Sequence, residues 1–130
     1  DYNRLIASVS GTMRLAHGAN GSEKLVLPRS TVYAFDGGIQ THCVGKARDL
    51  NLMLRKGAAE GELVFVDSGT ELDLEPAANE TMLLFELESG NAALCAGGNA
   101  RLRCTANGQC ALFTVRLVGE AIPDSDNRNG

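Results

Sequence analysis

One face of a predicted strand carries four side chains that could bind a small molecule. They alternate along the chain as Asp49, Asn51, Met53 and Arg55. Alternate residues of an extended strand share a face, and the leucines between these four predict that the opposite face is core. A carboxylate, an amide, a thioether and a guanidinium could line a ligand pocket. If the face is open to water, the same row is ordinary polar surface, and the residues alone leave both interpretations open.

Two aspartates could also do acid–base chemistry. Asp36 or Asp49 could act as a general base in a lyase, isomerase or hydrolase if burial raised its pKa. Each has a structural alternative. Asp36 precedes Gly37-Gly38, where an aspartate commonly shapes a turn, and Asp49 could pair with Arg48 or Arg55 and only brace the fold.

Metal, cofactor and covalent chemistry have no signature in the sequence. The chain has two histidines: His17 is predicted in a Gly/Asn loop, and His42 in a strand, exposed or hydrogen-bonded. Neither lies in an H-x-H pattern, so no metal site is expected. His42 and Cys43 are neighbours and would point to opposite faces of a strand, so they cannot form a dyad. No cofactor is expected, and G-x-S-x-G is absent.

The composition is that of a globular protein, with a formal charge of −4 and a pI of about 5.1. An acidic chain without a basic cluster argues against nucleic-acid binding, and no apolar run approaches the length of a membrane span. We therefore expect a cytoplasmic protein. Reduced cysteines are favoured, with Cys43 and Cys95 in apolar strand patterns. A bridge between Cys104 and Cys110 across a hairpin is the alternative.

Short apolar segments separated by glycine-rich turns predict an all-β fold, either a sandwich or a barrel. One helical turn or two is expected near residues 75–80. The segments predicted as strands are 4–10, 12–16, 24–27, 31–35, 41–44, 50–55, 61–66, 70–74, 81–87, 92–95, 100–104 and 110–118. We expect one domain over residues 1–122, with two runs of strands meeting near 57–60, and a polar tail over 123–130.

Three segments resemble the HutD/Ves family of cupin-like proteins. They are Asp1-Tyr2-Asn3-Arg4, Phe35-Asp36-Gly37 and Arg48-Asp49-Leu50-Asn51-Leu52-Met53. The family shows a D-x-x-R start, an F-x-G after a strand and a D-x-N-x-M strand about a dozen residues on, in this order. The resemblance covers roughly the first 57 residues and is thin beyond them.

The resemblance implies a double-stranded β-helix of bicupin type without a metal. It also implies a regulator in bacterial histidine utilisation that binds a carboxylated intermediate such as formiminoglutamate or urocanate. Family members carry an N-terminal segment with a W-x-N-G-G-G-like motif, which this sequence lacks. We expect the chain to be a fragment, a diverged relative, or a subunit whose N-terminal strands come from a homodimer or another chain.

Carried over by position, the ligand-binding residues are Asp36, Asp49, Asn51, Met53 and Arg55. Arg55 would bind a ligand carboxylate in a bidentate pair. Asn51 would satisfy an amide or imidazole, and Met53 would form an adaptable apolar wall. A small-molecule binder is therefore the favoured function, with a metal-independent enzyme and a structural subunit as alternatives.

Overall fold

The computed structural model describes residues 1–21, 23–98 and 100–118. The polar tail predicted over residues 123–130 lies outside them. The described residues divide into two compact units: unit 1 runs over Asp1–Arg55, and unit 2 begins at Lys56. No helix that could cross a membrane occurs in the part of the chain that is described.

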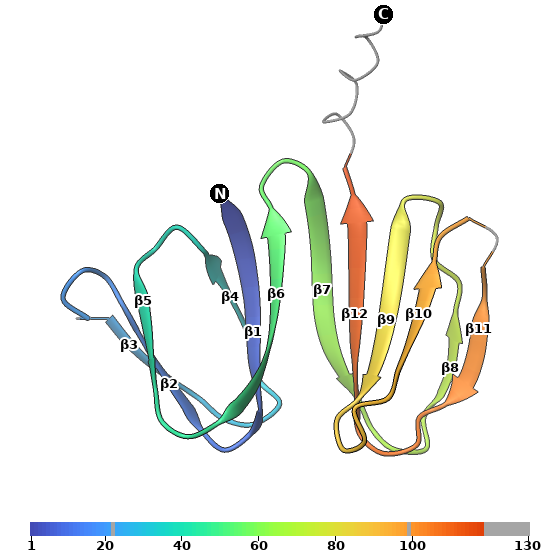
Figure 1. Cartoon of the computed structure of the whole chain (residues 1–130), viewed down its shortest axis with the longest axis horizontal. Coiled ribbons are helices and arrows are strands. Elements are labelled where there is room, and N and C mark those ends of the chain that lie inside the picture. The colour runs from blue at the N-terminus through green and yellow to red at the C-terminus, as the bar shows by residue number, and fades with distance from the viewer. Residues whose placement is uncertain (22, 99, 119–130) are drawn as a thin grey trace, which may run out of the picture. The chain divides into compact units, whose positions relative to one another are not determined.

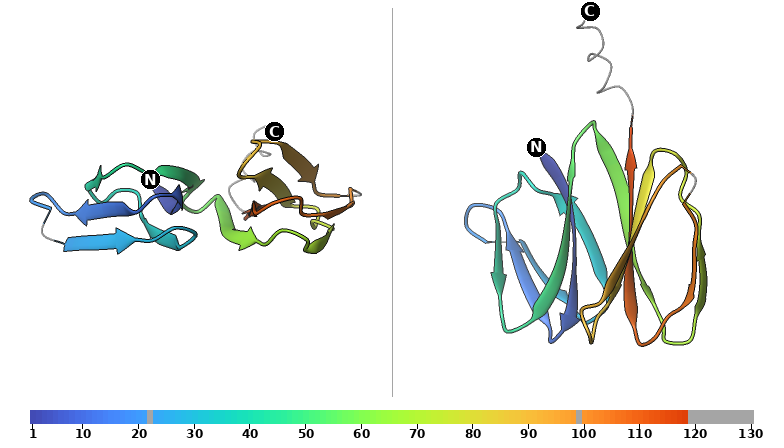
Figure 2. Two further views of the ribbon diagram at one scale, coloured as in Figure 1. Left: turned by 90° about the horizontal axis from the view of Figure 1, so that it is seen from below. Right: turned by 45° about the vertical axis from the view of Figure 1, so that its right-hand side comes forward.

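Unit 1 contains six strands in two three-stranded sheets (Figures 1 and 2). The strands are β1 (Tyr2–Ser10), β2 (Met13–His17), β3 (Glu23–Leu27), β4 (Val32–Asp36), β5 (Thr41–Val44) and β6 (Arg48–Arg55). One sheet has the order β4-β1-β6 and the other β3-β2-β5, with all pairs antiparallel. The pairs β1·β6 and β2·β5 are nested in sequence, which is the connectivity of a jelly roll.

The core of unit 1 lies between these two sheets. Its buried members are Ile6, Met13, Leu15 and Leu27, and two aromatic rings of β4 pack against them. Buried positions alternate along β2 because successive side chains of a strand point to opposite faces. The central strands β1 and β2 therefore supply most of the core, while β6 lies at a sheet edge.

Unit 2 repeats the nested arrangement with one four-stranded and one two-stranded sheet, ordered β10-β9-β12-β7 and β11-β8 (Figure 2). Its strands are β7 (Ala59–Val66), β8 (Glu71–Leu74), β9 (Glu80–Glu86), β10 (Ala92–Ala96), β11 (Leu102–Thr105) and β12 (Cys110–Leu117). The all-β prediction is confirmed, and the twelve predicted strands correspond to these twelve. The sheets remain separate and do not close into a barrel in the described part of the chain.

The helical turn predicted over residues 75–80 is wrong. The segment forms a tight turn that leads into β9, in which the Glu80 amide donates to the Ala77 carbonyl at 2.9 Å. The Glu80 carboxylate returns the contact by accepting from the Ala77 amide at 2.9 Å. This carboxylate also accepts from Arg116, and both contacts lower the pKa of Glu80. The side chain therefore closes the turn without a helix.

All four cysteines are free thiols, but they differ in environment. Cys95 is buried as expected, whereas the predicted burial of Cys43 is wrong, because β5 is an edge strand with exposed side chains. Cys110 is buried, and burial raises the pKa of its thiol. A thiolate is the reactive form of cysteine, so burial and the raised pKa both disfavour reaction at Cys110, whereas the Cys43 thiol is exposed.

We expect iodoacetamide to label Cys43 well before Cys95 or Cys110 in the folded protein. The exposed thiol meets the reagent directly, whereas the buried thiols need local opening. Peptide mapping by mass spectrometry at short labelling times measures the order. Labelling of Cys110 as fast as Cys43 would contradict the burial described.

Candidate functional site

The polar row of β6 lies on the core-facing side of its sheet, at the free edge. Asn51 pairs with Ile6 of β1, and Met53 pairs with Arg4. Residues directly opposite each other in a sheet share a face, so the row continues the core face of β1. The four predicted residues do share this face, and all are exposed, Met53 by 53%. On the opposite face of β6, Leu54 is buried.

Arg4 occupies the centre of this face and contacts both neighbouring strands. It pairs with Phe35 of β4 on one side and Met53 of β6 on the other. Its guanidinium carbon lies 5.1 Å from the Phe35 ring centroid, and its Nε donates to the Asn51 side-chain oxygen at 3.4 Å. The arginine is thus held by an aromatic face and a neutral amide.

The Arg4 guanidinium has no carboxylate partner among the described residues. Arg4 is half-buried as a residue, and a guanidinium with no counter-ion retains donors that suit a planar carboxylate. Arg4 is therefore the group on this face best placed to bind an anion. Arg55, the predicted carboxylate ligand, lies nearby on the same face, exposed and opposite Tyr2 of β1.

The F-x-G segment, Phe35-Asp36-Gly37, lies at the end of the sheet where β1 begins, next to Tyr2 and Arg4. The Gly37 amide donates to the Tyr2 carbonyl oxygen at 2.7 Å. A Cβ atom at Gly37 would lie 2.7 Å from that oxygen and 3.1 Å from the Arg4 Cγ and Cδ atoms. Only glycine allows the backbone to approach β1 this closely without displacing Arg4.

The two predicted aspartates lie apart. Asp36 ends β4, and one of its carboxylate oxygens accepts a hydrogen bond from the Gly38 amide at 2.8 Å, which is the turn role expected for this side chain. Asp49 is exposed at the other end of β6, opposite Ser8. No ion pair of the described residues includes Asp49, so the alternative that Arg48 or Arg55 braces it is wrong.

The prediction that His17 lies in a loop is wrong. His17 is the last residue of β2 and is only 5% exposed. Its Nδ1 lies 2.8 Å from the Thr41 hydroxyl oxygen, and its Nε2 lies 2.7 Å from the Tyr33 hydroxyl oxygen. Its ring centroid is 5.1 Å from that of Phe35. The histidine therefore joins the second sheet to the aromatic ring that supports Arg4. His42 is exposed, as predicted.

Sequence reasoning missed Arg4, His17, Tyr33 and Thr41 as site residues. Arg4 had a signal, because it is the last residue of the D-x-x-R pattern. His17 had a weaker one: Met13, Leu15 and His17 alternate, so the strand could have been extended by one residue. Tyr33 and Thr41 had none, because their roles come from pairing between strands distant in sequence.

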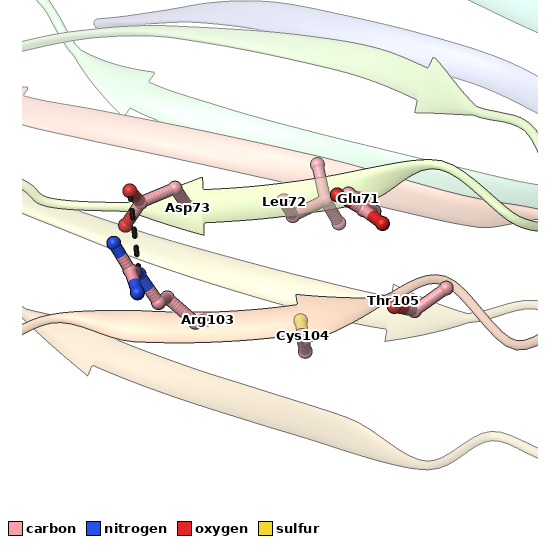
Figure 3. A pocket seen from close by; sticks show the side chains of 6 residues that line it. All are labelled: Glu71, Leu72, Asp73, Arg103, Cys104 and Thr105. Atoms are coloured by element: carbon pink, nitrogen blue, oxygen red, sulfur yellow. Dashed lines mark ion pairs between the residues drawn. The ribbon is translucent and has the colours of Figure 1, made fainter.

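Three hollows occur in the described part of the chain, and none of them is lined by Arg4 or by the polar row of β6. The largest, about 520 Å³, lies over β8 and β11 of unit 2, where Asp73 and Arg103 face each other (Figure 3). Asp73 already accepts two hydrogen bonds from Arg101, at 2.9 and 2.7 Å. The others, about 240 and 390 Å³, lie within unit 2 and over β2 and β3. No group of three potential metal ligands occurs in the described part of the chain.

The nested sheets and the polar inner face define an all-β, cupin-like protein. The sequence model of the HutD family matches residues 1–117, so the chain belongs to the HutD family. No curated protein matches the chain.

Two solved structures are similar to this chain. HutD from Pseudomonas fluorescens SBW25, determined in a formate condition, is 24% identical with a TM-score of 0.69, over 91% of this chain and 70% of that one. PA5104 from Pseudomonas aeruginosa PAO1, a conserved protein of unknown function, is 28% identical with a TM-score of 0.66, over 89% and 71%. These likenesses confirm the fold expected from the sequence.

Substitution of Gly37 by alanine is expected to destabilise unit 1 by about 1–3 kcal/mol, because the new Cβ meets backbone at 2.7 Å. Gly38→Ala is the matched control, since its Cβ meets only the Asp36 carboxylate, at 3.2 Å. Urea unfolding of the three proteins measures the difference. Equal free energies of unfolding for both variants would contradict the close approach of Gly37 to β1.

Asp73 provides a pH test of unit 2. The hydrogen bond from Arg101 lowers the pKa of Asp73, so its contribution to stability is present above the ordinary carboxyl pKa and is lost as pH falls through the lowered value. The melting-temperature gap between wild type and Asp73→Asn should therefore narrow on acidification. Asp67→Asn is the control, because Asp67 forms no ion pair among the described residues. A gap that stays constant to strongly acidic pH would contradict this role.

Proposed function

We propose that this HutD-family protein is a cytoplasmic, regulatory small-molecule binder of histidine utilisation. Its ligand would be a carboxylated pathway intermediate such as formiminoglutamate or urocanate, bound on the inner face of unit 1. The observation that carries this proposal is the guanidinium of the half-buried residue Arg4, which has no carboxylate partner among the described residues. The expected homodimer or partner chain stays a prediction.

The surroundings of Arg4 support a small organic anion over a bare inorganic one. Phe35 lies under the guanidinium and Met53 beside it, so apolar surface borders the charge. Asn51 adds an amide that can pair with either a donor or an acceptor. Specific small-molecule sites commonly combine apolar walls with a few placed polar groups.

The distribution of charge along the chain also favours unit 1 over unit 2 as the place where a carboxylated ligand binds. Residues 1–55 carry seven Lys and Arg against four Asp and Glu, whereas residues 56–130 carry five against twelve. A net positive unit attracts an anion, and a net negative one repels it. A carboxylated ligand is therefore expected on unit 1, where Arg4 and Arg55 share a face.

Isothermal titration of the purified protein with urocanate and with formiminoglutamate tests the proposal. We expect saturable binding to wild type and a roughly tenfold to hundredfold weaker affinity for Arg4→Met, which removes a charged hydrogen-bond donor. Arg14→Met is the matched control, because Arg14 is exposed on β2 between the buried core residues Met13 and Leu15, and so points away from the core.

Each outcome has a clear meaning. Equal affinities for wild type and Arg4→Met would place the ligand elsewhere. Absence of binding to either compound would contradict the proposed ligand class. A matching loss in Arg14→Met would indicate a nonspecific effect of net charge.

A further inference from the structure

The contact of Thr41 with the Ile39 carbonyl sets a direction for the hydrogen-bond chain around His17. The Thr41 hydroxyl lies 3.0 Å from the Ile39 carbonyl oxygen, which can only accept, so the single hydroxyl proton is donated there. With its proton directed there, the Thr41 oxygen accepts a hydrogen bond from His17 Nδ1–H, 2.8 Å away.

The other nitrogen of His17 is consequently an acceptor. A neutral imidazole with its proton on Nδ1 has a lone pair on Nε2, so the Tyr33 hydroxyl donates to it across 2.7 Å. An imidazolium would place a charge in a position only 5% exposed, with no carboxylate among its contacts in the described residues. The Nε2 lone pair of His17 therefore accepts the hydrogen bond of the Tyr33 hydroxyl, so the phenol proton is not available to a ligand.

Tyr33 is left with oxygen lone pairs and no free proton. Its ring stacks on Phe35 with centroids 5.3 Å apart, and Phe35 supports the Arg4 guanidinium at 5.1 Å. The Tyr33 ring and the Arg4 guanidinium thus lie on one aromatic row, and the Tyr33 ring centroid is separated from the guanidinium carbon by no more than the sum of these two spacings. One end of the row donates hydrogen bonds and the other accepts them.

We infer that the ligand of this site carries a carboxylate for Arg4 and an N–H donor for the Tyr33 oxygen, and that His17 is the positioning residue that fixes this polarity. The inference rests on the proposed function, because it concerns the same inner face of unit 1. It narrows the ligand class from carboxylates in general to carboxylates that also bear an amide, amidine, imidazole or ammonium N–H.

The tautomer of His17 can be measured without any ligand. Long-range ¹H–¹⁵N correlation spectra distinguish a protonated from an unprotonated ring nitrogen. We expect Nδ1 of His17 to be protonated and Nε2 unprotonated, with the His42→Gln variant used to assign the signals. A proton on Nε2 would overturn the inferred polarity.

A pair of matched ligands tests the specificity. Glutaramate and monomethyl glutarate share one carboxylate and a similar chain, but only the amide has an N–H. Wild type should bind glutaramate roughly tenfold more tightly, since the ester leaves the Tyr33 oxygen facing another acceptor. Tyr33→Phe and His17→Gln should reduce that ratio to about one, whereas His42→Gln should keep it.

Thermal unfolding checks that each variant is folded. If one of them is not, Thr41→Val replaces it, because this substitution removes the hydroxyl that accepts the hydrogen bond from His17 Nδ1.

The outcomes separate this inference from the proposed function. Equal binding of both ligands by wild type, lost in Arg4→Met, would overturn the inference and leave the carboxylate site in place. Failure of wild type to bind either ligand would overturn the inference, and failure to bind urocanate and formiminoglutamate as well would overturn the proposed function. A tenfold ratio that persists in Tyr33→Phe would also overturn the inference, because the discriminating group would then lie elsewhere.

Discussion

The Arg4 guanidinium holds together the segments that form the inner face of unit 1. It lies over Phe35 of β4 and donates to Asn51 of β6, while its own strand runs between the two. Gly37 allows the backbone to approach the Arg4 side chain closely. The D-x-x-R, F-x-G and D-x-N-x-M patterns therefore meet at one contact. The nested strand pairing of a jelly roll brings them into one sheet, although the second and third lie about 30 and 50 positions after Arg4.

The position of this contact makes the face suitable for the proposed ligand. A guanidinium buried between two carboxylates would serve only the fold, whereas Arg4 meets an aromatic ring and a neutral amide. β6 forms the edge of its sheet, so its polar row reaches water while the face continues into the core at Ile6. His17 extends the polar part of the face to the second sheet through Tyr33.

Local pattern predicted the strands and the shared face of Asp49, Asn51, Met53 and Arg55, because alternation in a strand is a property of the strand itself. It could not predict what depends on pairing. Cys43 looked like a core residue until β5 proved to be an edge strand, and His17 looked like a loop residue because glycine follows it. The helical turn predicted near residues 75–80 is wrong because the contact that closes this turn comes from the Glu80 side chain, which local pattern does not reveal.

The central claim is that Arg4 binds the carboxylate of the ligand. The Nε–H signal of Arg4 in ¹H–¹⁵N spectra reports on this contact directly, since a charge-assisted hydrogen bond changes the shielding of the donor proton. Titration with glutarate should move the Arg4 signal in a saturable way and leave the Arg14 signal unchanged. An Arg4 signal that stays fixed while glutarate saturates another part of the protein would contradict the account.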